Sequence, residues 1–253
     1  MPDPGELIPG AEPWSAEGGD VGALVLHGFT SNPSSMRGVA EPLAAAGFAV
    51  ELPLLPGHGT RVEDMIPTGF ADWLAVAEAT YLDLAARCRK VVVVGLSMGG
   101  ALTAWLASDY PDIAGVICIN AVVSAPEGMA EQIQGMVSQG IDRMDGIGSD
   151  IADPDSHESA YPETPLAPMI TMLEAAGEFR ERLGRITCPV LVITSMQDHV
   201  VDPSNSDVLA TSVSGPVERV RLERSYHVAT LDYDKDIVVA ATVEFAQKVT
   251  APA

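Results

Sequence analysis

Ser97 is the serine of a G-x-S-x-G motif that spans residues 95–99. In this pattern the serine lies on a sharp strand-to-helix turn, which exposes its hydroxyl for attack on a carbonyl carbon. The surrounding sequence agrees, because the apolar run 91–94 precedes the motif and a segment with helical periodicity begins at Met98. An isolated motif of this kind is also compatible with an ordinary glycine-rich turn. The flanking strand and helix favour Ser97 as a nucleophile.

A serine hydroxyl is a weak nucleophile until a base accepts its proton, so a histidine must come from elsewhere in the chain. His27 and His58 precede the serine, against the order serine, acid, histidine that accompanies this motif. His157 falls in a predicted insertion, and His199 directly follows the candidate acid. His227 comes after the last predicted strand and before the final predicted helix. We therefore expect His227 to be the base.

The third group must follow a strand between the nucleophile and the base. Asp198 does so, three residues after the apolar run 189–195. Its expected role is to hold the imidazole in the correct tautomer and to stabilise the imidazolium. Asp202 is the rival, but the pair Asp202-Pro203 is more typical of a helix N-cap followed by proline at the first helical position.

Acyl transfer also requires two backbone N–H donors for the developing oxyanion. One should come from Met98, the residue after the nucleophile. The other should come from the loop that follows the strand predicted at 21–29, and we assign it to the N–H of Phe29.

The elements that would position these groups alternate along the chain. Apolar runs predict strands at 21–29, 48–55, 90–97, 113–121, 189–195 and 217–223. Segments 71–88, 98–108 and 237–249 have the three- and four-residue apolar spacing of helices. This alternation predicts an α/β fold with a mostly parallel central sheet and helices on both faces. The Pro/Gly-rich first twenty residues are expected to wrap the surface.

The interval between residues 121 and 189 is too long for a single crossover, so we expect a small inserted cap at 126–161, between core segments 1–125 and 162–253. A return helix is expected at 163–184. An apolar stripe in the cap must cover either the sheet or the substrate pocket, and we expect it to bind substrate. The residues of this stripe are Met129, Ile133, Met136, Val137 and Ile141, and Met144 and Ile147 are further apolar residues of the same segment.

Composition limits the classes of partner. Hydrophobic residues form 47% of the chain and the formal net charge is −21, which describes a globular protein repelled by phosphate backbones and anionic lipid surfaces. We expect no nucleic-acid partner, no stable membrane insertion, no metal and no cofactor. The three cysteines, Cys88, Cys118 and Cys188, are widely spaced and are expected to be buried thiols. With no signal-peptide pattern at the start, a cytoplasmic location is expected.

Four segments together resemble bacterial monoacylglycerol lipases and related carboxylesterases. They are 26–30, 54–60, 95–100 and 225–232, supported by 63–65 and 72–73. The resemblance covers nearly the whole chain and implies a core of six to eight strands, a small cap and a deep acyl pocket. Segment 158–165 resembles the part of the family's cap that supplies a glutamate to the glycerol group, which implies a substrate-binding role for Glu158.

The predicted function is hydrolysis of monoacylglycerols or similar lipid-like carboxylic esters through an acyl-enzyme on Ser97. A general short- or medium-chain carboxylesterase or a thioesterase is the alternative within the same class. An alternative of another class is a non-catalytic module that only holds a small apolar ligand. The intact set Ser97, Asp198 and His227 argues against that module.

Overall fold

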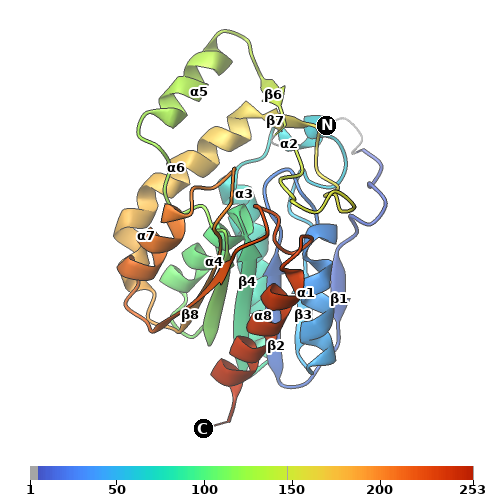
Figure 1. The fold of residues 1–253 in the computed structure, drawn as a ribbon, viewed down its shortest axis with the longest axis vertical. Helices are drawn as coiled ribbons and strands as arrows, with labels where there is room; N and C mark the ends of the chain where they lie inside the picture. Colours follow the sequence, from blue (N-terminus) through green and yellow to red (C-terminus); the bar gives the residue numbers. More distant parts are fainter. Residues whose placement is uncertain (1–4, 147, 253) are drawn as a thin grey trace.

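The computed structural model describes residues 5–146 and 148–252, so Ile147 of the predicted cap lies outside the described residues. A central sheet of seven strands organises the chain (Figure 1). Its strands are β1 (Trp14–Ala16), β2 (Val21–Leu26), β3 (Ala49–Leu52), β4 (Lys90–Leu96), β5 (Gly115–Ile119), β8 (Val190–Ser195) and β9 (Val217–Leu222). The spatial order is β1-β3-β2-β4-β5-β8-β9.

All neighbouring strands in this sheet are parallel except β1, which pairs antiparallel with β3. The six predicted runs each contain one of the parallel strands, and the predicted mostly parallel sheet is confirmed. The expectation that the first twenty residues only wrap the surface is wrong for β1. This edge strand has three residues and one partner, so its own sequence carries little periodic signal.

Alternate residues of β4 enter two different hydrophobic cores, one on each face of the sheet. Val91 and Val93 belong to one core, whereas Val92 and Val94 belong to the other. The first core is covered by α3 (Phe70–Arg87), α4 (Met98–Asp109), α6 (Leu166–Arg182) and α7 (Ser204–Ser212), and the second by α1 (Ser34–Ala45) and α8 (Lys235–Thr250). Burial on both faces explains the unbroken valine run, since no face of a central parallel strand meets water.

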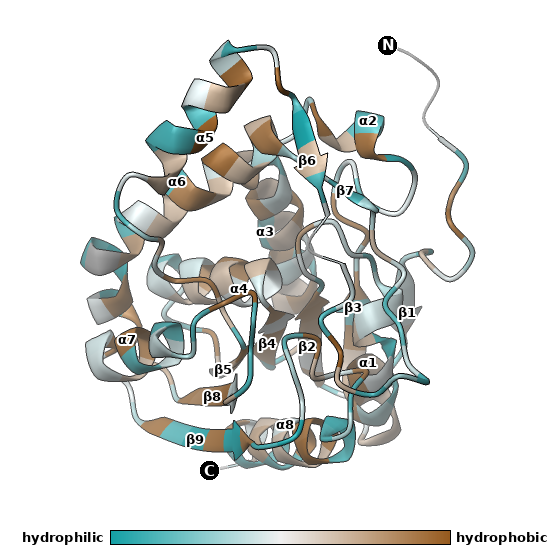
Figure 2. Cartoon of the chain, turned by 45° about the horizontal axis from the view of Figure 1, so that its top comes forward, coloured by the Kyte–Doolittle hydropathy of each residue, from teal (hydrophilic) through white to brown (hydrophobic). Residues whose placement is uncertain are grey.

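Helix α4 is the most deeply buried helix of the fold, with every residue from Met98 to Ser108 buried. It packs directly on β4 and β5, behind the turn that carries Ser97. Figure 2 shows hydrophobic colour along β2 and β4, while the edge strand β9 carries hydrophilic segments. The nucleophile turn therefore joins two rigid, fully packed elements.

The segment predicted to form a cap, described at residues 126–146 and 148–161, rises above the carboxyl end of the sheet (Figure 1). It contains α5 (Met129–Ser138) and β6 (Arg143–Asp145), and β6 pairs antiparallel with β7 (Glu163–Pro165). The small sheet is thus completed just beyond the predicted cap boundary at residue 161, and α6 follows it at once. Two short elements, α2 (Val62–Met65) and a 3-10 turn, η1 (Leu183–Arg185), complete the chain. Throughout residues 5–146 and 148–252, no helix is both long and apolar enough to span a membrane.

Candidate active site

Ser97 occupies a sharp turn between β4 and α4, with φ 58° and ψ −117°. A non-glycine residue with positive φ is strained, and such strain concentrates at functional sites. The turn requires glycine on both sides. A Cβ at Gly95 would lie 2.0 Å from the carbonyl oxygen of Gly99, and a Cβ at Gly99 would lie 2.3 Å from that of Leu26. The spacing of the motif is therefore dictated by backbone contact.

His227 and Asp198 form a buried pair. Nδ1 of His227 donates to Oδ2 of Asp198 over 2.7 Å, and the two side chains are 9% and 1% exposed. The other carboxylate oxygen, Oδ1, accepts the N–H groups of Val200 and Val201, each at 2.8 Å. With its proton on Nδ1, the neutral imidazole leaves Nε2 able to accept a proton.

Asn120, at the end of β5, ties together the loops that carry this pair. Its Oδ1 accepts the N–H of Ser195 at 2.8 Å, and its Nδ2 donates to the carbonyl oxygen of His227 at 2.7 Å. The residue adopts φ 46° and is 3% exposed. Sequence reasoning missed Asn120; the available signal was a polar side chain at the carboxyl end of an apolar strand, where open α/β sheets place ligand sites.

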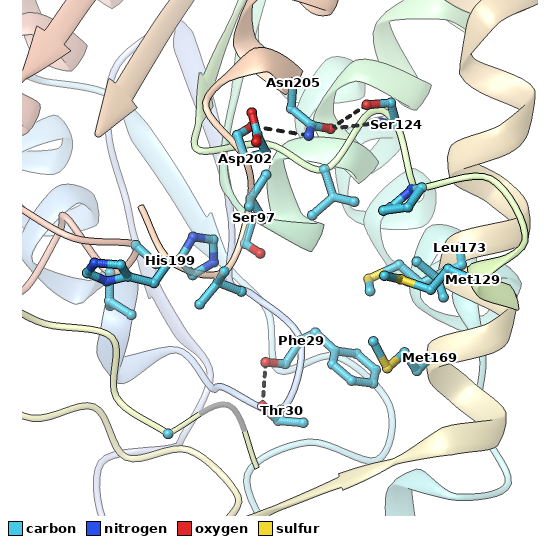
Figure 3. A pocket seen from close by; sticks show the side chains of 18 of the residues that line it. Phe29, Thr30, Ser97, Ser124, Met129, Met169, Leu173, His199, Asp202 and Asn205 are labelled. Carbon is cyan, nitrogen blue, oxygen red and sulfur yellow. Dashed lines mark hydrogen bonds between the residues drawn. The ribbon is translucent and has the colours of Figure 1, made fainter. Parts of the chain in front are cut away.

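A cavity of about 410 Å³ opens beside Ser97 and His227. Figure 3 shows Phe29, Met129, Met169 and Leu173 grouped on one side of it, with His199 on the opposite side. A polar corner joins Asn205 and Ser124, whose N–H donates to Asn205 Oδ1 at 2.8 Å. The other lining residues are Thr30, Val122, Pro126, Gly148, Glu158, Met172, Val200, Val201, Asp202 and Val228. The cavity wall is thus largely apolar, as an acyl chain requires.

The loop after β2 contacts the nucleophile turn. A Cβ at Gly28 would lie 3.5 Å from the Cβ of Ser97, and the next residue, Phe29, lines the cavity. His27 braces this loop, since its Nδ1 donates to the Gly28 carbonyl at 3.0 Å and its Nε2 accepts the N–H of Leu55 at 3.2 Å. Burial lowers the pKa of His27 to about 4, so the imidazole is neutral at pH 7. Both predicted oxyanion donors, Phe29 and Met98, therefore flank the Ser97 turn.

Glu158 lines the same cavity, as a substrate contact would. Its Oε1 accepts the hydroxyl of Ser31 at 2.5 Å. Burial raises the pKa of Glu158, and the hydrogen bond from Ser31 and the proximity of His227 oppose this shift. Three residues on, the N–H of Tyr161 donates to the carbonyl of Thr30 at 3.0 Å. The segment from 158 to 161 is therefore fixed against the loop after β2.

The predicted cap stripe divides in the structure. Met129 lines the cavity and also packs against a cluster between α5 and α6. Ile133, Met136 and Val137 contribute to this cluster without lining the cavity, and Ile141 is 41% exposed. We correct the expectation that Ile133, Met136, Val137 and Ile141 bind substrate: none of them is among the residues that line the cavity. The stripe packs against a surface that the sequence did not suggest, formed by Leu166, Ile170 and Leu173 of α6.

Helix α6 supplies the apolar wall that the stripe of α5 was expected to supply. Its residues Met169, Met172 and Leu173 line the cavity. Sequence reasoning interpreted α6 only as a return helix to the sheet. The signal was present as closely spaced methionines at 169 and 172, because methionine adapts to chains of varied shape.

The rival residues take other roles. Asp202 Oδ1 accepts the N–H of Ser204 at 2.8 Å at the start of α7, which is the capping contact expected of it, although it also borders the cavity. His199 hydrogen-bonds through Nδ1 to Asp150 at 2.8 Å. His58 is buried, with its pKa lowered well below the ordinary value by burial and by His27, and His157 is exposed.

Comparisons with known proteins agree with this geometry. A thermostable monoacylglycerol lipase of Bacillus sp. (strain H-257) is 46% identical over 245 residues, which is 96% of both chains. A carboxylesterase of Bacillus subtilis (strain 168) is 26% identical over 241 residues, covering 94% of this chain and 96% of the relative. The resemblance inferred from the four motifs is confirmed.

Solved structures show the same architecture. A structure from work on the metagenome-derived lipolytic enzymes LipS and LipT superposes with a TM-score of 0.92 at 38% identity, covering 96% of this chain and all of the other. Monoacylglycerol lipase from Paleococcus ferrophilus shares the fold with a TM-score of 0.78 at 18% identity, over 94% of this chain and 100% of that one. The family model described as "Alpha/beta hydrolase family" matches residues 23–241, and the chain belongs to this family.

Proposed function

We propose that this protein hydrolyses monoacylglycerols and similar carboxylic esters through an acyl-enzyme formed on Ser97. The observation that carries the proposal is the strained Ser97 turn opening onto the same cavity as His227, whose Nδ1 lies 2.7 Å from the buried Asp198 carboxylate. A nucleophile, a base and an orienting acid are the parts that acyl transfer needs.

In the acylation step, Oγ of Ser97 attacks the ester carbonyl carbon while Nε2 of His227 accepts the hydroxyl proton. The carbonyl π electrons move to the oxygen, and the N–H groups of Phe29 and Met98 donate to this oxyanion. When the tetrahedral intermediate collapses, the C–O bond to the alcohol breaks, and the alcohol leaves with the proton from His227. The acyl group remains as an ester of Ser97.

In the deacylation step, a water molecule takes the place of the alcohol. Its proton passes to Nε2 of His227 as its oxygen attacks the acyl carbon, and the C–O bond to Ser97 breaks. Ser97 regains the proton, and the carboxylic acid is released. Throughout, Asp198 stabilises the transient imidazolium through Nδ1.

The two parts of the substrate meet different surfaces. The apolar wall of Phe29, Met129, Met169 and Leu173 suits an acyl chain, because it removes apolar surface from water. The carboxylate of Glu158 is the group we propose for a glycerol hydroxyl, since it borders the cavity with one oxygen already held by Ser31. The 46% identical relative named as a monoacylglycerol lipase supports this substrate class.

A panel of esters that varies the acyl length and the alcohol independently tests the proposal. Monoacylglycerols should give a higher kcat/KM than the methyl esters and thioesters of the same acyl chains. Equal rates for glycerol and methyl esters would favour a general carboxylesterase, and faster thioesters would favour a thioesterase. Saturable binding of these esters without hydrolysis would instead favour the non-catalytic module.

A further inference from the structure

Asp150 lies in the segment that returns from the cap, yet its carboxylate contacts both loops of the proposed catalytic pair. Oδ2 accepts the backbone N–H of His227 at 3.0 Å and that of His199 at 3.1 Å. Oδ1 accepts Nδ1–H of His199 at 2.8 Å. The side chain is 13% exposed, so these bonds are largely shielded from competing water.

The two backbone N–H groups that donate to Asp150 belong to the two loops that carry the proposed catalytic acid and base. One belongs to the base itself, His227, and the other to His199, the residue directly after the acid Asp198. A single carboxylate oxygen therefore joins the loop that carries the acid to the loop that carries the base. The 2.7 Å contact between Asp198 and His227 depends on the relative position of these loops.

A second carboxylate, on the loop of His227, accepts hydrogen bonds from the segment that contains Asp150. Asp232, in the loop after His227, is fully buried and accepts the N–H groups of Ala152 at 2.8 Å and Asp153 at 3.0 Å. The N–H of Val228 adds a backbone bond of 3.1 Å to the carbonyl of Asp150. Segment 150–153 is thus bound to the His227 loop from both sides.

We propose that Asp150 is a positioning residue for the hydrolytic reaction, because its carboxylate holds the loop of His227 against the loop of Asp198. The inference rests on the proposed function of Ser97, Asp198 and His227. Asp150 acts by accepting hydrogen bonds from the main chain, so its effect depends on having an acceptor at Oδ2 rather than on carrying a charge.

This distinction defines the variants. In Asp150→Asn, the amide oxygen can still accept both backbone N–H groups, while the NH₂ group donates to Nδ1 of His199 once that imidazole adopts its other neutral tautomer. In Asp150→Ala, the N–H of His227 no longer has this acceptor. Asp155, an exposed carboxylate five residues further along, gives the matched control Asp155→Ala.

The experiment counts reactive sites by titration with a fluorophosphonate and then measures kcat per titrated site and KM on one ester. Because small displacements of catalytic groups cost up to about 100-fold, Asp150→Ala should lower kcat per site by about 10- to 100-fold. Asp150→Asn should stay within about threefold of wild type because its amide oxygen keeps both backbone hydrogen bonds. Asp155→Ala should stay within the same range, as ordinary surface substitutions do, and KM should change by no more than about threefold in all three variants.

If Asp150→Ala does not fold, Asp150→Ser replaces it, because its hydroxyl keeps one acceptor on a shorter side chain. Its kcat per titrated site should be lower than that of Asp150→Asn. An alanine variant with fewer titratable sites but normal kcat per site would show a purely structural role and overturn the proposal. Equal losses of kcat per site in Asp150→Ala and Asp150→Asn would also overturn the proposal, because they would show that Asp150 acts through its negative charge. Failure of the wild type to label and to hydrolyse esters would instead reject the proposed function.

Discussion

One oxygen of the Asp198 carboxylate accepts the Nδ1 proton of His227 at 2.7 Å, while the other is held by two main-chain N–H groups. The carboxylate therefore cannot rotate away from the imidazole without breaking bonds to its own loop. Such a fixed acceptor favours the neutral tautomer that carries its proton on Nδ1, which leaves Nε2 available to accept the proton of the Ser97 hydroxyl.

Exchange of the acid should separate Asp198 from its rival Asp202. Asp198→Asn replaces one oxygen by an amide that favours the wrong imidazole tautomer, so kcat should fall by about 10²- to 10⁴-fold. Asp202→Asn keeps an oxygen that can accept the N–H of Ser204, and its loss should be less than about tenfold, as for a cap substitution. Steady-state kinetics on one ester gives both values, and the reverse ranking would transfer the role to Asp202.

Acyl-chain preference should depend on α6 rather than on the apolar stripe of α5. Met172 lines the cavity, so Met172→Ser should lower kcat/KM more for long acyl chains than for short ones, at about 25 cal/mol for each Å² of acyl surface that the serine leaves in water. Met136 packs against the cluster between α5 and α6. Met136→Ser should therefore lower the melting temperature and leave the ratio of kcat/KM for long acyl chains to kcat/KM for short ones unchanged. If only Met136→Ser changed this kcat/KM ratio, the acyl chain would have to contact α5 rather than α6.

Glu158 should act on the alcohol part of the substrate. Glu158→Gln removes the charge while keeping the shape, so monoacylglycerols should lose about 1.5–3 kcal/mol of transition-state stabilisation, the usual value of a hydrogen bond to a charged group. Methyl esters of the same acids should change little. Comparison of kcat/KM on matched pairs measures this difference, and an equal loss on both alcohols would assign Glu158 a role in holding the loop near Ser31.

Acid should weaken the fold through the buried histidines. His27 and His58 have pKa values below the ordinary 6.5 because burial disfavours their charged forms, to about 4 for His27. The unfolded chain therefore binds more protons as the pH falls below 6.5, and each histidine reduces stability by up to about 1.4 kcal/mol per pH unit towards its folded pKa.

A variant isolates this contribution from that of the many carboxylates. The free energy of unfolding of wild type minus that of His58→Gln, measured by denaturant titration, should decrease as the pH is lowered from 6.5 towards 4. Stability profiles that run parallel over this range would show that His58 titrates equally in the folded and unfolded states.

The parallel sheet and the proposed catalytic set could be predicted because their signals are local. An unbroken run such as Val91–Val94 is compatible only with a strand buried on both faces, and the glycines around Ser97 report a turn that no other residue fits. The order of Ser97, Asp198 and His227 along the chain then follows from the fold.

The groups that hold the site together could not be predicted, because their partners are distant in sequence. Asp150 and His227 are 77 positions apart, and Asn120 and His227 are 107 apart, so no local pattern in the sequence predicts either contact. The prediction that Ile133, Met136, Val137 and Ile141 bind substrate differs from the structure for a related reason. Periodicity shows that a face is buried but does not show what covers it, and here α6 does.

The decisive measurement for the proposed mechanism is the site of covalent labelling by a fluorophosphonate, located by peptide mass spectrometry in wild type and in Ser97→Ala. The mechanism predicts one adduct, on Ser97. In Ser97→Ala it predicts neither an adduct nor the bulk of esterase activity, with only about 10³- to 10⁴-fold catalysis over water remaining from the oxyanion donors and binding. An adduct on another residue, or near-normal turnover by Ser97→Ala, would contradict it.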